Sequence, residues 1–209
     1  AIVGPTGAGK TTLINLLMRF YDVDGGSILV DGVDTKEMTR HELRDRFGMV
    51  LQDAWLFEGS IRDNIAYAQD NLPEEKIIAA ARSASVDSFI KTLPGGYDFE
   101  LSRGAENISQ GQRQLLTIAR AMASDPEIMI LDEATSNVDT HTEQLIQKAL
   151  AKLMHGRTSF VIAHRLSTIR DADMILYMEH GDILEHGSHE ELMAQHGKYE
   201  ALYMSQFAQ

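Results

Sequence analysis

The sequence contains no cysteine and only one tryptophan, Trp55. Without cysteine the chain can form neither a disulfide framework nor a thiolate metal site. This absence also fits a cytosolic location. No apolar run approaches the roughly 20 residues that a membrane-spanning helix needs. Any membrane role therefore requires other chains or other segments.

Basic residues are also scarce. Nineteen Lys and Arg stand against 31 Asp and Glu, which gives a formal net charge of −12. Because nucleic-acid binding requires a basic face, this balance predicts no nucleic-acid partner. The remaining composition, 44% hydrophobic and 24% charged in 209 residues, is typical of one well-cored domain or one domain with an insertion.

Strand and helix patterns alternate along the chain, which predicts an α/β fold with a mostly parallel central sheet flanked by helices. The chain opens inside a strand, so we expect a domain whose first strands are missing. Between about 54 and 125 the patterns are mostly helical and predict an inserted helical subdomain within one domain, 1–209. Strands are predicted at 1–3, 25–32, 47–51, 127–131, 158–163, 173–178 and 181–187. Helices are predicted at 11–20, 39–46, 73–84, 140–154 and 166–172, and a further helix begins after Ser109.

A glycine-rich segment, GPTGAGKT, follows the first strand and precedes a helix. It matches G-x-x-x-x-G-K-[ST], the phosphate loop, in which successive backbone N–H groups surround a phosphate. The alternative is a glycine turn that merely opens a helix, but the strand before and the helix after favour the phosphate loop. The predicted nucleotide contacts are Gly4, Pro5, Thr6, Gly7, Ala8, Gly9, Lys10, Thr11 and Thr12.

Polar residues follow three further apolar strands. These residues are Gln52, the pair Asp132 and Glu133, and His164. Because the carboxyl ends of parallel strands share one edge of a sheet, we expect them to converge near the phosphate loop. Taken singly, each has a simpler explanation: a polar strand end, the start of a loop, or a surface histidine.

The convergence assigns roles to these side chains. Thr11, Gln52 and Asp132 are predicted to hold Mg²⁺, directly or through water. Glu133 is predicted to polarise the attacking water, and His164 to hydrogen-bond the γ-phosphate. Gln52, Glu133 and His164 are therefore the predicted catalytic residues.

A second candidate anion site lies a hundred residues further on, in ENISQGQRQL. Ser109 precedes Gln112 by three residues, which is the spacing of a capping box at a helix start. A hydroxyl, a glycine and free N–H groups at a helix N-terminus suit an anion. The alternative is that Ser109 only caps its own helix, and the two roles are compatible.

The motifs together resemble the nucleotide-binding domain of ATP-binding cassette (ABC) proteins, over essentially the whole chain. The segment 108–112, ISQGQ, is similar to the signature motif usually written LSGGQ, which separates ABC proteins from other phosphate-loop ATPases. The other matches are GPTGAGKT to Walker A, IMILDE at 128–133 to Walker B, Gln52 to the Q-loop, 136–139 to the D-loop and His164 to the switch histidine.

The resemblance implies that two such domains pack head to tail, with each ATP between the Walker motifs of one domain and the signature helix of the other. It implies Mg²⁺ as the second cofactor. The residues that would contact the nucleotide of the partner domain are Ser109, Gln110, Gly111, Gln112 and Asp139. Gln110 stands where the family usually has glycine, which predicts a weaker ATP site at this helix. The adenine-stacking aromatic of the family lies upstream of Walker A and so outside this chain.

Segments 56–68, 92–98 and 162–192 resemble ABC exporters with fused membrane domains. The resemblance therefore implies an ATPase motor at the cytoplasmic face of a membrane. Its expected partners are a second nucleotide-binding domain, in a homodimer or a heterodimer, and a transmembrane domain fused upstream. Alternatives are a soluble ABC ATPase that acts on ribosomes or DNA, and a nucleotide-gated module that does not hydrolyse. Trp55 and Phe57 form either a docking surface or part of the core.

Overall fold

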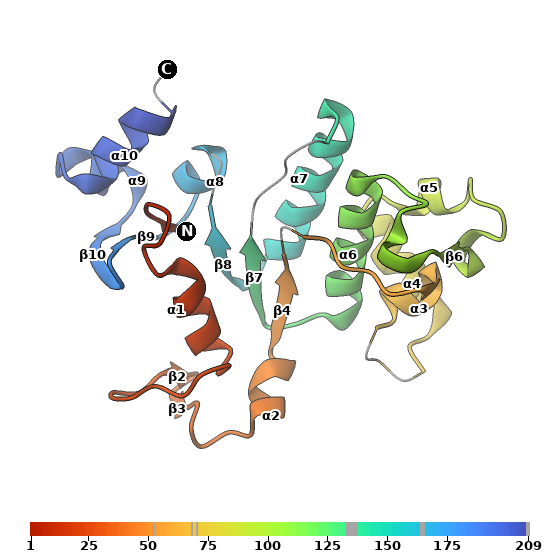
Figure 1. Cartoon of the computed structure of the whole chain (residues 1–209), viewed down its shortest axis with the longest axis horizontal. Helices are drawn as coiled ribbons and strands as arrows, with labels where there is room; N and C mark the ends of the chain where they lie inside the picture. The colour runs from red at the N-terminus through yellow and green to blue at the C-terminus, as the bar shows by residue number, and fades with distance from the viewer. Residues whose placement is uncertain (52, 68, 70, 133–137, 164–165, 208–209) are drawn as a thin grey trace. The chain divides into compact units, whose positions relative to one another are not determined.

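The computed structural model describes residues 1–51, 53–67, 69, 71–132, 138–163 and 166–207 (Figure 1). The chain divides into two compact units. The first contains Ala1–Phe47, Ile130–Glu133 and Phe160–Gln209, and the second contains Gly48–Met129 and Ala134–Ser159. Within the described ranges, none of the helices combines the length and the apolar character needed to cross a membrane.

A six-stranded sheet has the order β10-β9-β1-β8-β7-β4. Strand β1 pairs in parallel with β8 and β9, whereas β9 pairs with β10 in the antiparallel direction. The predicted mostly parallel α/β fold is confirmed. The strands are Asp182–Gly187 (β10), Ile175–Glu179 (β9), Ile2–Val3 (β1), Thr158–Ile162 (β8), Ile128–Asp132 (β7) and Phe47–Val50 (β4).

The first unit carries the helix that follows the glycine loop. This helix, α1, ends at Leu17, three residues before the predicted end at residue 20. Arg19 adopts a left-handed conformation with φ of 52° and donates hydrogen bonds to the carbonyls of Thr35 and Met38, so the chain turns there instead. The other elements of this unit are β2 (Leu29–Val30), β3 (Val33–Asp34), α2 (Arg40–Asp45), α8 (Leu166–Arg170), α9 (His189–Ala194) and α10 (Lys198–Phe207).

The second unit is mainly helical. Its longest helices, α6 and α7, pack against each other, and α6 also packs against α3 and α4. The predicted subdomain at 54–125 stays a prediction, because this unit also contains α7. Its elements are β5 (Gly59–Ser60), α3 (Ile61–Ile65), α4 (Glu74–Ser83), α5 (Asp87–Ile90), η1 (Gly96–Asp98), β6 (Glu100–Leu101), η2 (Arg103–Ala105), α6 (Gln110–Ser124) and α7 (Thr140–Met154).

Asn64 of α3 is completely buried and joins α3 to α6. Its amide nitrogen donates to the carbonyls of Phe57 and Ser60, both at 3.0 Å. Its amide oxygen accepts from the Phe57 N–H at 3.1 Å and from Arg120 of α6 at 2.9 Å. The Arg120 Nε also donates to the Asn64 carbonyl at 2.8 Å. One buried amide therefore fixes the loop before α3 and the position of α6.

Replacing Asn64 with Ala should lower the free energy of unfolding by about 2–4 kcal/mol, because buried partners lose their hydrogen bonds. Asn107 provides a matched control: it also bonds a backbone N–H and a carbonyl, those of Ser102 and Glu100, but it is exposed. Asn107→Ala should cost about 1 kcal/mol or less, because water replaces the lost bonds. Urea denaturation measures both variants, and equal losses would contradict the buried network.

Candidate functional site

The phosphate-loop segment lies between β1 and α1, at the carboxyl end of a strand with a neighbour on each side. In the register, Ile2 faces Ile162 of β8 and Leu176 of β9, and Val3 faces Tyr177. The sequence prediction of a strand, a glycine loop and a helix is confirmed for this segment.

Two glycines of the loop are fixed by different constraints. Gly4 has a φ of 148°, and a Cβ placed on it would lie 2.1 Å from the carbonyl oxygen of Met178. No side chain fits there, because the opposing atom belongs to the backbone. Gly9 has a φ of 102°, in the left-handed region that glycine adopts without strain. Between them Pro5, Thr6 and Gly7 are exposed, whereas Ala8 is buried.

Helix α1 begins differently from its neighbours. The side chains of Thr39, Ser60, Ser109, Asp139 and Ser188 each accept a hydrogen bond from a first-turn N–H of the helix that follows. Helix α1 instead begins at Gly9 with no side-chain cap, and α4 and α5 also begin without one, at Pro73 and Val86. Its first N–H groups, together with the helix dipole, therefore favour an external anion.

The side chain of Lys10 folds back over the loop. Its Nζ donates to the carbonyls of Gly4 at 2.7 Å and Pro5 at 3.0 Å. Burial lowers the pKa of Lys10 below its usual value, and the nearby Asp132 carboxylate opposes that shift. The structure thus brings together the lysine of the loop and the predicted carboxylate at the end of β7, within the first unit.

The described donor atoms fit a magnesium ion. Thr11 and Thr12 are exposed in the first turn of α1, and Asp132 is half-buried at the end of β7. Mg²⁺ is bound through one or two protein oxygens and substrate phosphates, and it keeps several waters. A hydroxyl and a carboxylate meet that need. In the described residues no group of three or more acidic or histidine side chains forms a self-sufficient metal site.

Several predicted site residues lie outside the described residues: Gln52, Glu133, His164 and the first part of the D-loop, 136–137. Their expected convergence on the loop stays a prediction.

The second predicted anion site belongs to the second unit, and its capping box is confirmed. The Ser109 hydroxyl accepts from the Gln112 N–H at 3.3 Å, and the Gln112 side chain accepts from the Ser109 N–H at 2.8 Å. Gln110, the first residue of α6, is half-buried. Ser109 therefore caps its own helix, and its role toward a nucleotide stays a prediction.

Gly111 is the position in α6 at which a side chain does not fit. A Cβ there would lie 2.4 Å from the Thr142 Cγ2 and 3.1 Å from the Val138 Cγ1. Asp139 stands between these two residues and caps α7 by accepting the Thr142 N–H at 3.0 Å. That backbone hydrogen bond lowers the pKa of the Asp139 carboxyl. The signature segment and the end of the D-loop thus form one packed corner between α6 and α7.

Trp55 lies on the surface, with 60% of it exposed. Its ring centroid is 6.3 Å from those of Phe57 and Tyr67. The Arg120 guanidinium lies 4.8 Å from the Tyr67 ring centroid and donates to the Trp55 carbonyl at 3.0 Å. Burial lowers the pKa of Arg120. The sequence reading left Trp55 open between core and surface and missed Tyr67 and Arg120, because nothing in the local pattern links them to it.

A phosphate loop with its lysine beside a strand-end carboxylate, in a mostly parallel sheet, defines a phosphate-loop nucleotide-binding fold. The family model for the ABC transporter matches residues 1–136. A fatty acid ABC transporter ATP-binding/permease protein of Mycobacterium bovis is 58% identical over 95% of this chain and 32% of its own length. An ATP-dependent lipid A-core flippase of Desulfotalea psychrophila is 52% identical over 99% of this chain and 36% of its own.

Among solved structures, a bacterial Atm1-family ABC exporter with ATP bound matches with a TM-score of 0.90 and 43% identity, over 100% of this chain and 36% of that chain. The chain belongs to the ABC transporter family. It spans about a third of the length of the relatives that it matches.

Replacing Gly111 with Ala should lower the free energy of unfolding by about 1–3 kcal/mol, because the added methyl overpacks the corner between α6 and α7. Thr142→Ser removes the Cγ2 that the new methyl would strike. The double variant should therefore lose less stability than the two single losses added together. Chemical denaturation of the four proteins measures this coupling. Additive losses would show that α7 does not restrict position 111.

Proposed function

We propose that this chain is the ATP-binding and ATP-hydrolysing motor domain of an ABC exporter. The observation that carries the proposal is the start of α1, where first-turn N–H groups without a side-chain cap stand beside Lys10. This arrangement suits the β- and γ-phosphates of a nucleotide, because it presents aligned N–H groups and a cation to one anion. Family membership and the match to an ATP-bound exporter support it.

Hydrolysis in this proposal depends on positioning and on charge rather than on covalent chemistry. Lys10 leaves the loop carbonyls and neutralises the phosphate charge. Glu133 orients and polarises the attacking water, while Gln52 and His164 complete the contacts near the γ-phosphate. Mg²⁺, held by Thr11 and Asp132 together with Gln52, supplies charge neutralisation when bound.

The signature corner serves a second domain. The N-terminus of α6, from Ser109 to Gln112, together with Asp139, would contact the nucleotide bound to a partner nucleotide-binding domain in a head-to-tail dimer. ATP binding closes the dimer and hydrolysis reopens it, which drives a fused transmembrane domain between two states. The permease part of the relatives' names supports such a fusion, and with it a place at the cytoplasmic face of a membrane.

The alternatives have less support. A soluble ABC ATPase acting on ribosomes or DNA does not fit the permease and flippase names of the relatives or the net charge of −12. A module that binds ATP without hydrolysis would have no need of Glu133 and His164, both of which the sequence retains.

Lys10→Ala should lower the ATPase kcat/KM of the full-length protein by about 100-fold or more, because the charge facing the phosphates is lost. Lys36→Ala is the control, since Lys36 is an exposed lysine of the same unit outside the loop. It should retain wild-type activity. Steady-state ATPase measurements compare the two variants, and wild-type turnover in Lys10→Ala would refute the assignment of the loop.

Glu133→Gln should preserve ATP binding and slow hydrolysis by about 100-fold or more, because the amide keeps the shape but cannot act as a base. The variant should therefore accumulate in an ATP-closed dimer. Single-turnover hydrolysis and ATP-dependent association test this, with the exposed Glu190→Gln as control. Rapid hydrolysis without ATP-dependent closure would count against the proposed motor.

A further inference from the structure

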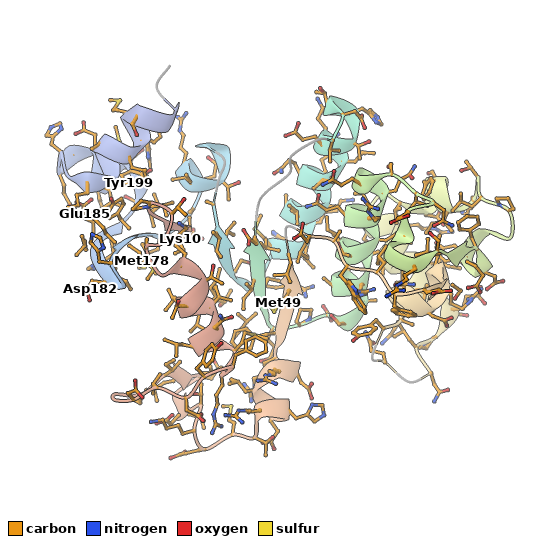
Figure 2. The ribbon with its side chains drawn as sticks, viewed as in Figure 1. Lys10, Met49, Met178, Asp182, Glu185 and Tyr199 are labelled. Atoms are coloured by element: carbon orange, nitrogen blue, oxygen red, sulfur yellow. The ribbon has the colours of Figure 1, made fainter. Side chains whose placement is uncertain are left out.

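The phosphate loop rests on the end of the β9–β10 hairpin. The Gly181 N–H donates to the Ala8 carbonyl at 2.9 Å. A Cβ on Gly9 would lie 3.2 Å from the Gly181 Cα, and the Met178 Cε would lie 3.7 Å from it. Figure 2 labels Met178 of β9 and Lys10 of α1. Strand β9 and the turn that follows it thus contact the loop along its buried side.

The bond from Gly181 is external to the loop. Within the described residues, the other hydrogen bonds of the loop join it to itself or to α1: Ala8 N–H to the Pro5 carbonyl, and Lys10 to the carbonyls of Gly4 and Pro5. Those internal bonds move with the loop. The bond from Gly181 holds the loop against a paired strand of the sheet, so it fixes the direction of the backbone groups that precede α1.

We propose that the turn His180–Gly181 is a positioning element for the phosphate loop, with Gly181 as the positioning residue that holds the loop in its phosphate-binding conformation. This inference rests on the nucleotide-binding function proposed above. In this proposal Gly181 acts through Ala8, to which it donates its N–H.

The conformation of the turn explains why this position is a glycine. His180 and Gly181 have φ of 54° and 89°, the consecutive left-handed pair of a tight two-residue hairpin. A Cβ on Gly181 would meet nothing within 4 Å. The effect of Gly181→Ala therefore comes from the backbone alone: alanine is strained at this φ, so the turn relaxes and withdraws its N–H from the Ala8 carbonyl.

The same unit contains a matched control. Asp31 and Gly32 join β2 to β3 with φ of 50° and 81°, and a Cβ on Gly32 also meets nothing within 4 Å. Figure 1 places this hairpin at the C-terminal end of α1, away from the loop. Gly32→Ala thus introduces the same backbone strain at a turn that does not contact the loop.

The experiment compares Gly181→Ala and Gly32→Ala in the full-length protein by thermal unfolding and by steady-state MgATP hydrolysis. Both variants should lower the unfolding midpoint by similar amounts. Gly181→Ala should raise the KM for MgATP about three- to tenfold, the factor that one hydrogen bond supplies. Gly32→Ala should leave KM within about twofold of wild type. Gly181→Asn should raise KM less than Gly181→Ala does, because asparagine adopts the left-handed region more readily than alanine, though less readily than glycine.

Equal KM values for the two alanine variants would overturn the inference. So would a Gly181→Asn variant that regains the wild-type unfolding midpoint but keeps the KM of Gly181→Ala. If Gly181→Ala does not fold, the pair Gly181→Asn and Gly32→Asn decides: a higher KM at 181 supports the inference and equal values overturn it. Failure of the proposed function looks different. In that case the wild-type protein itself would not bind MgATP, or Lys10→Ala would hydrolyse ATP at the wild-type rate.

Discussion

The close approach of two backbone segments sets the geometry of this site. Where Gly4 meets strand β9, a Cβ would lie 2.1 Å from the carbonyl oxygen of Met178, so only glycine allows the contact. The chain leaves β1 there and must turn within a few residues to begin α1 at Gly9. Because the loop packs against a paired strand, the orientation of its N–H groups is fixed. Anion binding by the backbone requires several N–H groups that point toward the same anion.

The helices of the chain show how one type of N-terminus can serve two purposes. At α2, α7 and α9 a side chain accepts one first-turn N–H, and the helix start is structural. At α1 a glycine leaves these groups for an external acceptor. The start of α6 combines the two, since Ser109 caps the helix while its hydroxyl and backbone remain at an exposed position. In the proposed dimer, that combination suits a contact made only when a partner brings its nucleotide.

Packing in the second unit fixes α6 from two directions. The buried Asn64 and Arg120 attach it to α3, and Gly111 lies tightly against Val138 and Thr142. The exposed Trp55 is attached to the same arginine. Helix α6 therefore carries both Arg120, which holds the Trp55 carbonyl, and Gly111, which packs against the start of α7.

The sequence by itself determined the phosphate-loop segment and the capping boxes at Ser109 and Ser188, because each depends on residue spacing within one segment. It also determined the α/β class, because strand and helix patterns alternate along the chain. It also predicted α7 with the observed bounds. Local patterns failed where a distant residue decides the outcome: α1 stops at Leu17 because Arg19 bonds the carbonyls of Thr35 and Met38. Only the tertiary structure set Gly181 against Ala8 and Arg120 beneath Tyr67. These contacts join segments more than 50 residues apart, and the local spacing of residue types cannot predict contacts over that distance.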